Sequence, residues 1–169
     1  MAQELPYYLI NAFTDGTLFL GNPAAVFIIE TELESATMQA IASDLNLPAT
    51  VFYFPSNNHL IRWFAPYSEI PLCGHGTLAL GHVLFNEFGY NRKAVELTTH
   101  FGDKLTLQHS NGFIQVELPR LHCTIAELKN KAEIEQTFGF TIKQYYSGDR
   151  EVLIVEDVET LVQLKPNFT

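Results

Sequence analysis

The sequence has few cysteines and few basic residues, and each shortage excludes a class of protein. Two cysteines in 169 residues cannot form the disulfide framework of a small secreted domain, so we expect reduced thiols and a cytoplasmic protein. Ten Lys and Arg residues against 19 Asp and Glu residues give a net charge of −9. This balance argues against nucleic acid or an anionic membrane surface as a partner.

Long hydrophobic runs are also missing. The longest, residues 24–29, is too short to cross a bilayer, so we expect no membrane insertion. The N-terminus lacks the basic and apolar regions of a secretory signal. No Cys-x-x-Cys or His-Glu-x-x-His pair occurs, and we therefore expect no metal site.

The residues that are present suit a packed core, because 47% are hydrophobic and 12% are aromatic. Alternating or β-branched runs predict strands, and Asn111-Gly112 predicts a tight hairpin. The predicted strands of the first 118 residues are 8–13, 24–29, 50–54, 60–65, 94–99, 105–108 and 113–118.

Two helices are predicted among these strands. Thr31 and Glu34 have capping-box spacing and would open the first, which ends near Asn46. Residues 74–88 form the second, which is apolar in nearly every direction and stops at Gly89, so we expect it to be enclosed. The pattern predicts an α+β fold in which a mostly antiparallel, barrel-like sheet wraps around this central apolar helix.

Residues 119–169 predict the start of a second unit. Thr124 and Glu127 suggest a helix cap, and Ile125, Leu128 and Ala132 share a helical face that runs to Gly139. Strands 141–146 and 152–155 and a short helix, 159–164, follow. Because this unit has no enclosed helix of its own, we expect a complete domain at 1–118 and a truncated second domain at 119–169.

The start of the helix at 74–88 is the candidate site. Gly74 and Gly76 lack Cβ atoms, so a ligand can approach the backbone N–H groups that favour an anion at a helix N-terminus. Cys73 and His75 flank this position, and a thiol there tends toward a lowered pKa. The alternative is a glycine turn that allows close packing around a buried thiol.

Several motifs together resemble the phenazine-biosynthesis PhzF family, which shares its fold with diaminopimelate epimerase. The motifs, in order, are Asn11-Ala-Phe-Thr14, Gly21-Asn-Pro-Ala-Ala-Val26, Asn46-Leu47-x-x-Thr50-x-Phe52, Arg62-Trp-Phe64 and Leu72-Cys-Gly-His-Gly-Thr-Leu78. The resemblance implies two similar domains with the active site in the cleft between them. It also implies isomerisation or epimerisation of a small carboxylate-bearing substrate by proton transfer, without a cofactor.

The resemblance assigns the site residues. Cys73 takes the position of a catalytic cysteine of the epimerases, and Cys73 with His75 would be the acid/base pair. Gly74, Gly76 and Thr77 would bind the substrate carboxylate, and Asn22 would contact the substrate.

Two departures from the family are evident. The family usually carries an acid/base glutamate where this chain has Ala49, and it continues for about a hundred residues beyond Thr169. We therefore expect a half-built site that a complementary half completes. Glu69 is a candidate substitute for the lost acid, although a loop carboxylate is the simpler interpretation.

Two other functions stay open. The chain fits a catalytically inactive member that binds a small carboxylate or a protein partner, and Cys73 with His75 also fits a thiol hydrolase. Because an incomplete second unit leaves sheet edges and apolar surface exposed, we expect a homodimer.

Overall fold

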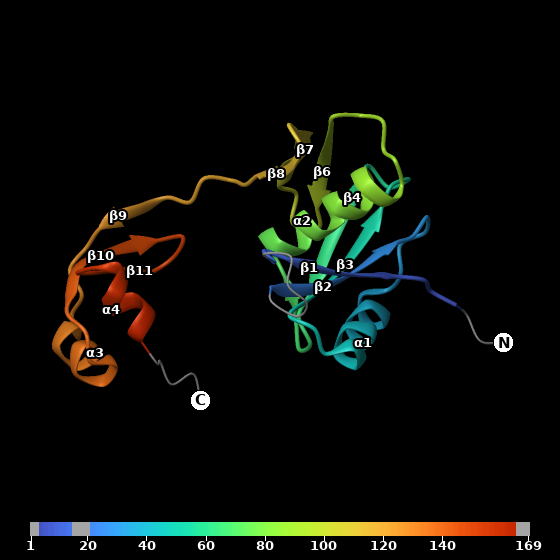
Figure 1. The fold of residues 1–169 in the computed structure, drawn as a ribbon. Helices are drawn as coiled ribbons and strands as arrows, with labels where there is room; N and C mark the ends of the chain where they lie inside the picture. The colour runs from blue at the N-terminus through green and yellow to red at the C-terminus, as the bar shows by residue number, and fades with distance from the viewer. Residues whose placement is uncertain (1–3, 15–20, 165–169) are drawn as a thin grey trace. The chain divides into compact units, whose positions relative to one another are not determined.

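The computed structural model describes residues 4–14 and 21–164, and it divides the chain into two compact units, Met1–Pro119 and Arg120–Thr169 (Figure 1). The first unit contains β1 (Tyr8–Ala12), β2 (Asn22–Ile28), α1 (Ser35–Leu45), β3 (Ala49–Phe54), β4 (Leu60–Phe64), β5 (Glu69–Ile70), α2 (Gly74–His82), the π-helical turn η1 (Val83–Glu87), β6 (Ala94–Thr99), β7 (Lys104–Ser110) and β8 (Phe113–Glu117).

The first unit is an α+β fold built on one eight-stranded mixed sheet, with strand order β1-β2-β3-β4-β6-β7-β8 and β5 beside β4. The expectation of a mostly antiparallel sheet missed the parallel pairs β2–β3 and β4–β6. The physical reason is that α1 lies between β2 and β3 in the chain, and that β5 and α2 lie between β4 and β6. Such a crossover returns the chain to the end of the sheet at which the first strand of the pair began, so the second strand runs parallel to the first.

The sheet is buried on both faces at its middle strands, and every residue of β3 is buried. One face, the α2 layer, packs Val51, Trp63 and Leu107 against Leu80 and neighbouring residues of α2. The other face, the α1 layer, packs Phe27, Phe52, Phe54 and Phe64 against Met38 and Ala42 of α1. Successive side chains of a strand point to opposite faces, so an all-apolar strand such as β3 serves both layers.

The segment predicted as one helix over 74–88 changes geometry partway. It is α-helical to His82, then forms η1, and Gly89 follows with φ +60°. Glycine was expected as the left-handed stop and takes that conformation. Enclosure is incomplete, because the outer side of the segment exposes Phe88 (55%) and leaves His82 half-exposed, with Asn86 Nδ2 3.0 Å from His82 Nδ1.

The hairpin predicted at Asn111-Gly112 is confirmed. Asn111 and Gly112 both have positive φ and join β7 to β8, the backbone that an Asn-Gly turn requires. Asn58 and His59 also have positive φ in the turn between β3 and β4. The capping box predicted at Thr31 is wrong, because α1 begins after Glu34 and no side chain caps it.

The second unit contains β9 (Cys123–Ile125), α3 (Lys131–Phe138), β10 (Ile142–Gly148), β11 (Val152–Val155) and α4 (Val158–Gln163), with the three strands in the order β11-β10-β9. The helix predicted from Thr124 is wrong in its first turns, because residues 123–125 pair with β10. The tertiary pairing outweighs the local helical pattern there. None of the helices in the described part of the chain is long and apolar enough to span a membrane.

Close packing of α2 on the sheet makes a first prediction. A Cβ atom added at Gly81 would lie 2.6 Å from Ile114 Cγ2 and 3.0 Å from Leu107 Cδ1. Gly81→Ala should therefore lower the free energy of unfolding by about 1–2 kcal/mol through overpacking. Gly74→Ala is the matched control, because its Cβ would meet only Leu118 Cδ1 at 3.8 Å, and it should be neutral or stabilising. Urea unfolding followed by the fluorescence of Trp63, the one tryptophan, measures both, and equal effects would contradict the packing argument.

Candidate functional site

The N-terminus of α2 is formed by an extended approach and an abrupt change to helix. Cys73 occupies the N-cap position with φ −137° and ψ 98°, and the helix begins at Gly74. The first helical backbone bond runs from Thr77 N–H to the Cys73 carbonyl at 3.0 Å. The N–H groups of residues 74–76 therefore have no acceptor within the helix, which is the arrangement that favours an anion.

Cys73 and His75 come together at this end of the helix. Cys73 Sγ lies 3.4 Å from His75 Nδ1, and Cys73 is only 6% exposed. Burial raises the pKa of the thiol, and the backbone N–H of Gly76 opposes the shift without cancelling it. The expectation of a lowered pKa is therefore wrong, because the loss of hydration outweighs the helix terminus. A buried thiol of raised pKa also weakens the thiol hydrolase interpretation.

His75 is the partner of this thiol. Burial lowers the pKa of the imidazole, and the backbone carbonyl of Pro23 opposes the shift. Its Nε2 atom is buried and makes no hydrogen bond to the described residues. The pKa directions of Cys73 and His75 both favour a neutral pair, in which the thiol donates to Nδ1 and the imidazole carries its proton on Nε2.

The residues expected to bind a carboxylate differ in access. Gly74 is half-buried, and a Cβ there would have room. Gly76 is buried, and a Cβ would lie 3.0 Å from Val51 Cγ2 and 3.2 Å from both Trp63 Cδ1 and Cys73 Sγ. Close packing therefore requires glycine at 76, as in the alternative interpretation. Thr77 is fully buried and its hydroxyl donates to the Cys73 carbonyl at 2.8 Å, so this hydroxyl serves the helix.

The start of β2 reaches the same end of α2. Asn22 is half-buried and pairs with Ala12 across the sheet. It directly precedes Pro23, whose carbonyl acts on His75. Asn22 is thus adjacent in sequence to the residue whose carbonyl opposes the lowering of the His75 pKa.

Two positions are candidates for a carboxylic acid at this site, and neither provides an unpaired carboxylate. Ala49 is completely buried opposite Ala24 at the start of β3 and has no ionisable group. Glu69 binds Arg62 through two hydrogen bonds, Nε to Oε1 at 2.8 Å and Nη2 to Oε2 at 2.6 Å. The carboxylate of Glu69 is therefore part of an ion pair and does not replace the missing glutamate.

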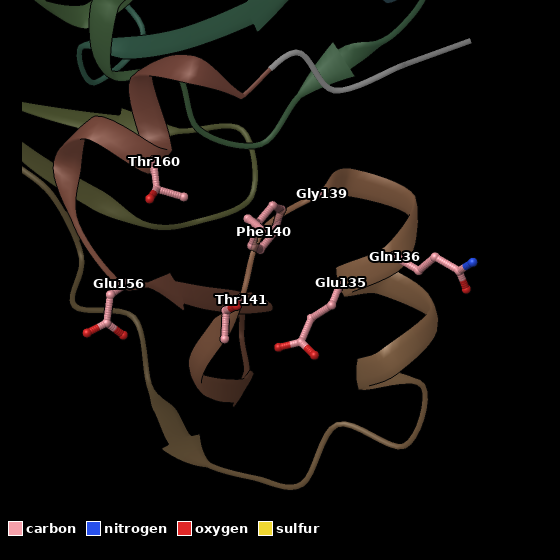
Figure 2. Close-up of a pocket in the computed structure, with 7 residues that line it drawn as sticks. All are labelled: Glu135, Gln136, Gly139, Phe140, Thr141, Glu156 and Thr160. Atoms are coloured by element: carbon pink, nitrogen blue, oxygen red, sulfur yellow. The ribbon is translucent and has the colours of Figure 1, made fainter.

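Each unit also has a hollow in its surface whose lining includes neither Cys73 nor His75. One of about 210 Å³ borders α2 beyond the candidate site and is lined by Ile10, Asn11, Ala12, Phe13, Leu78, Ala79, His82 and Ile114. A second, of about 510 Å³, lies on the second unit between α3, β11 and α4 (Figure 2). Its two carboxylates already have partners, since Glu135 Oε1 accepts from Ile142 N–H and Glu156 lies 3.9 Å from Lys143. The described residues contain no cluster of three or more His, Cys, Asp or Glu side chains suited to a metal ion.

Sequence reasoning missed the role of Arg62 and Trp63. Arg62 is 3% exposed and Trp63 is 1% exposed, and the indole Nε1 has no hydrogen-bond partner within the described ranges. The available signal was a charged residue inside the apolar run 60–65, because a buried arginine in a strand needs several acceptors close by.

Known proteins are similar to this chain along most of its length. Residues 10–169 match the family model PhzC-PhzF, described as phenazine biosynthesis-like protein. An uncharacterized isomerase of Halalkalibacterium halodurans is 32% identical over 97% of this chain and 62% of its own length. The human phenazine biosynthesis-like domain-containing protein is 34% identical over 90% of this chain and 56% of its own.

Solved structures agree. A PhzF family protein of Enterococcus faecalis superposes with a TM-score of 0.85 and 33% identity, covering 97% of this chain and 62% of that protein. A putative phenazine biosynthesis PhzC/PhzF protein of Clostridium difficile gives a TM-score of 0.78 and 31% identity, covering 95% and 61%. The chain thus spans less than two thirds of the length of these relatives. With the family model matched from residue 10 to residue 169, this chain belongs to the phenazine biosynthesis-like PhzC-PhzF family of isomerase-like proteins.

Proposed function

We propose that the first unit carries one half of an isomerase or epimerase site that moves a proton on a small carboxylate-bearing substrate without a cofactor. The observation that supports it is the 3.4 Å contact between Cys73 Sγ and His75 Nδ1 at the N-terminus of α2. The proposal keeps two domains, 1–118 and 119–169, and the cytoplasmic location expected from the sequence.

The chemistry follows from the neutral pair. The Cys73 sulfur accepts a proton from the substrate carbon as its own proton passes to His75 Nδ1. The C–H bond breaks, new S–H and N–H bonds form, and the electron pair stays on the carbon beside the carboxylate. The N–H groups at the start of α2 hold that carboxylate, with Gly74 the accessible member, and Asn22 contacts the substrate. Inversion at carbon needs a second acid on the opposite face, which a complementary half-site supplies.

A second candidate function rests on two specific observations. Ala49 stands where the family's acid/base glutamate is expected, and Cys73 is buried with a raised pKa. Both suit a catalytically inactive member that binds a small carboxylate, or a protein partner, through the same helix terminus.

Exchange of hydrogen with solvent separates these two functions. In D₂O the chain should incorporate deuterium at the carbon next to the carboxylate of at least one compound in a panel of small carboxylic and amino acids, read by NMR. Cys73→Ala should slow this exchange by about 10²–10⁴-fold, the usual contribution of a positioned acid or base. Cys123→Ala and His82→Gln are the controls, since both residues lie outside the pair, and they should exchange at the wild-type rate. Binding by calorimetry without exchange would reject the enzyme and support the inactive member.

The histidine itself gives a pH prediction. Because burial lowers the pKa of His75 from its ordinary 6.5, less than half of the imidazole should be protonated at pH 6.5, where an exposed histidine is half protonated. An NMR titration should place the midpoint of His75 below pH 6.5, and loss of the signal in His75→Gln assigns the resonance. The rate of deuterium exchange into the substrate should fall only below that midpoint. A midpoint above 6.5 would contradict the buried neutral pair.

Assembly is part of the proposal, because a half-site needs a complement. Within the described residues the end strands β1 and β8 each pair with one neighbour, and they expose Leu9 (59%) and Phe113 (70%). We infer a two-fold homodimer in which two first units meet across the face that, by the family resemblance, a complete second domain would cover.

Light scattering after size exclusion should give twice the 19.1 kDa chain mass. Leu9→Lys with Phe113→Lys should shift the population toward the monomer, because charge on both end strands opposes pairing. A wild-type chain that stays monomeric at high concentration would reject the homodimer.

A further inference from the structure

A buried guanidinium lies next to the segment that leads into the candidate site. Arg62 sits in the middle of β4, is 3% exposed, and its guanidinium lies 5.3 Å from the centre of the Phe64 ring in the α1 layer. A charge in such a place is stable only when several acceptors surround it, so its partners show what the residue holds together.

The partners come from two different segments. Glu69 of β5 binds the guanidinium with two nearly parallel bonds of 2.8 and 2.6 Å. Glu32 lies 3.2 Å from Nη1, and Ser35 Oγ accepts from Nη2 at 2.8 Å, both from the chain that enters α1. Arg62 therefore joins the segment before α1 to the segment before α2.

The segment before α2 has little else to hold it. β5 is two residues long and pairs with β4 at Ile70 and Glu69 only, and the chain then passes through residues 71–72 to Cys73. The adjoining turn is bound from α1, where Gln39 Nε2 donates to the carbonyls of Ala65 and Pro66 at 3.0 and 3.1 Å. Glu69 is the last charged side chain before the cysteine, four residues away.

We propose that Arg62 is a positioning residue, which through Glu69 keeps the 69–73 segment in place and Cys73 buried against His75. That the placement serves catalysis rests on the function proposed above, whereas the placement itself does not. The guanidinium thus has two carboxylate partners, which we call its arms. The Glu69 arm belongs to the segment that carries Cys73. The Glu32 arm binds the same guanidinium on the far side and touches no residue of that segment.

The two arms supply matched variants. Glu69→Gln removes the charge that faces the site segment, and Glu32→Gln removes the charge of the other arm with the same change in shape. Arg62→Lys keeps the positive charge but cannot make two parallel bonds to one carboxylate. Each change retains polar atoms and side-chain length, which limits the risk of global unfolding.

The measurement is the rate at which iodoacetamide alkylates Cys73 in the absence of substrate, followed by peptide mass spectrometry. Cys123, half-buried in the second unit with its thiol directed at the Arg150 carbonyl, is the internal reference. We expect alkylation of Cys73 to rise at least tenfold in Glu69→Gln and in Arg62→Lys. In Glu32→Gln it should stay within twofold of wild type, and Cys123 should react equally in all four proteins.

The dependence on urea separates positioning from general stability. If Arg62 positions the segment, the faster alkylation of Cys73 in the variants appears without denaturant. It then changes little at low urea, because only the 69–73 segment opens. Alkylation in Glu69→Gln that follows the global unfolding measured by Trp63 fluorescence would overturn the proposal, as would equal effects of the two glutamine variants. If the wild-type protein shows no deuterium exchange but the variants show the expected alkylation pattern, the proposed function is rejected and the positioning role of Arg62 stands.

Discussion

The close approach of α2 to the sheet is the constraint on which the rest of the first unit depends. Gly76 and Gly81 let the helix backbone lie against Val51, Trp63 and Leu107 without the gap that a Cβ would impose. That approach brings the helix start down to the level at which β2 and β3 begin. The Pro23 carbonyl thereby acts on the pKa of His75, and Cys73 joins the apolar cluster of the α2 layer. The same packing shapes the candidate site and buries the Cys73 thiol.

Burial shifts the pKa values of Cys73 and His75 in opposite directions, and both shifts favour the uncharged form. It raises the pKa of Cys73 and lowers that of His75. An uncharged thiol is a poor nucleophile, but beside His75 it can pass its proton to the imidazole while it takes one from carbon, so that no thiolate accumulates in the dry site. This balance is why the geometry supports proton transfer better than acyl chemistry.

The sequence predicted most strands, the glycine stop at Gly89 and the Asn111-Gly112 turn, because these depend on local backbone preferences. It missed the parallel pairs and the strand at 123–125, because pairing between distant segments overrides a local pattern. In the site, the sequence placed Cys73 and His75 on either side of the helix start, and the structure adds the 3.4 Å contact between their side chains. The direction of the Cys73 pKa was not predictable, since it depends on burial by β3 and β4, residues far away in sequence.

The π-helical turn at residues 83–87 has a consequence for chain length within the family. Each π turn holds one residue more than the α turn it replaces, and here it lies between a core-packed helix and the left-handed Gly89. Removing one residue from it restores ordinary helical winding while both ends keep their places. Natural variants shorter by one position should therefore be tolerated at this turn and nowhere earlier in the helix, where the glycine spacing is fixed by contact with the sheet.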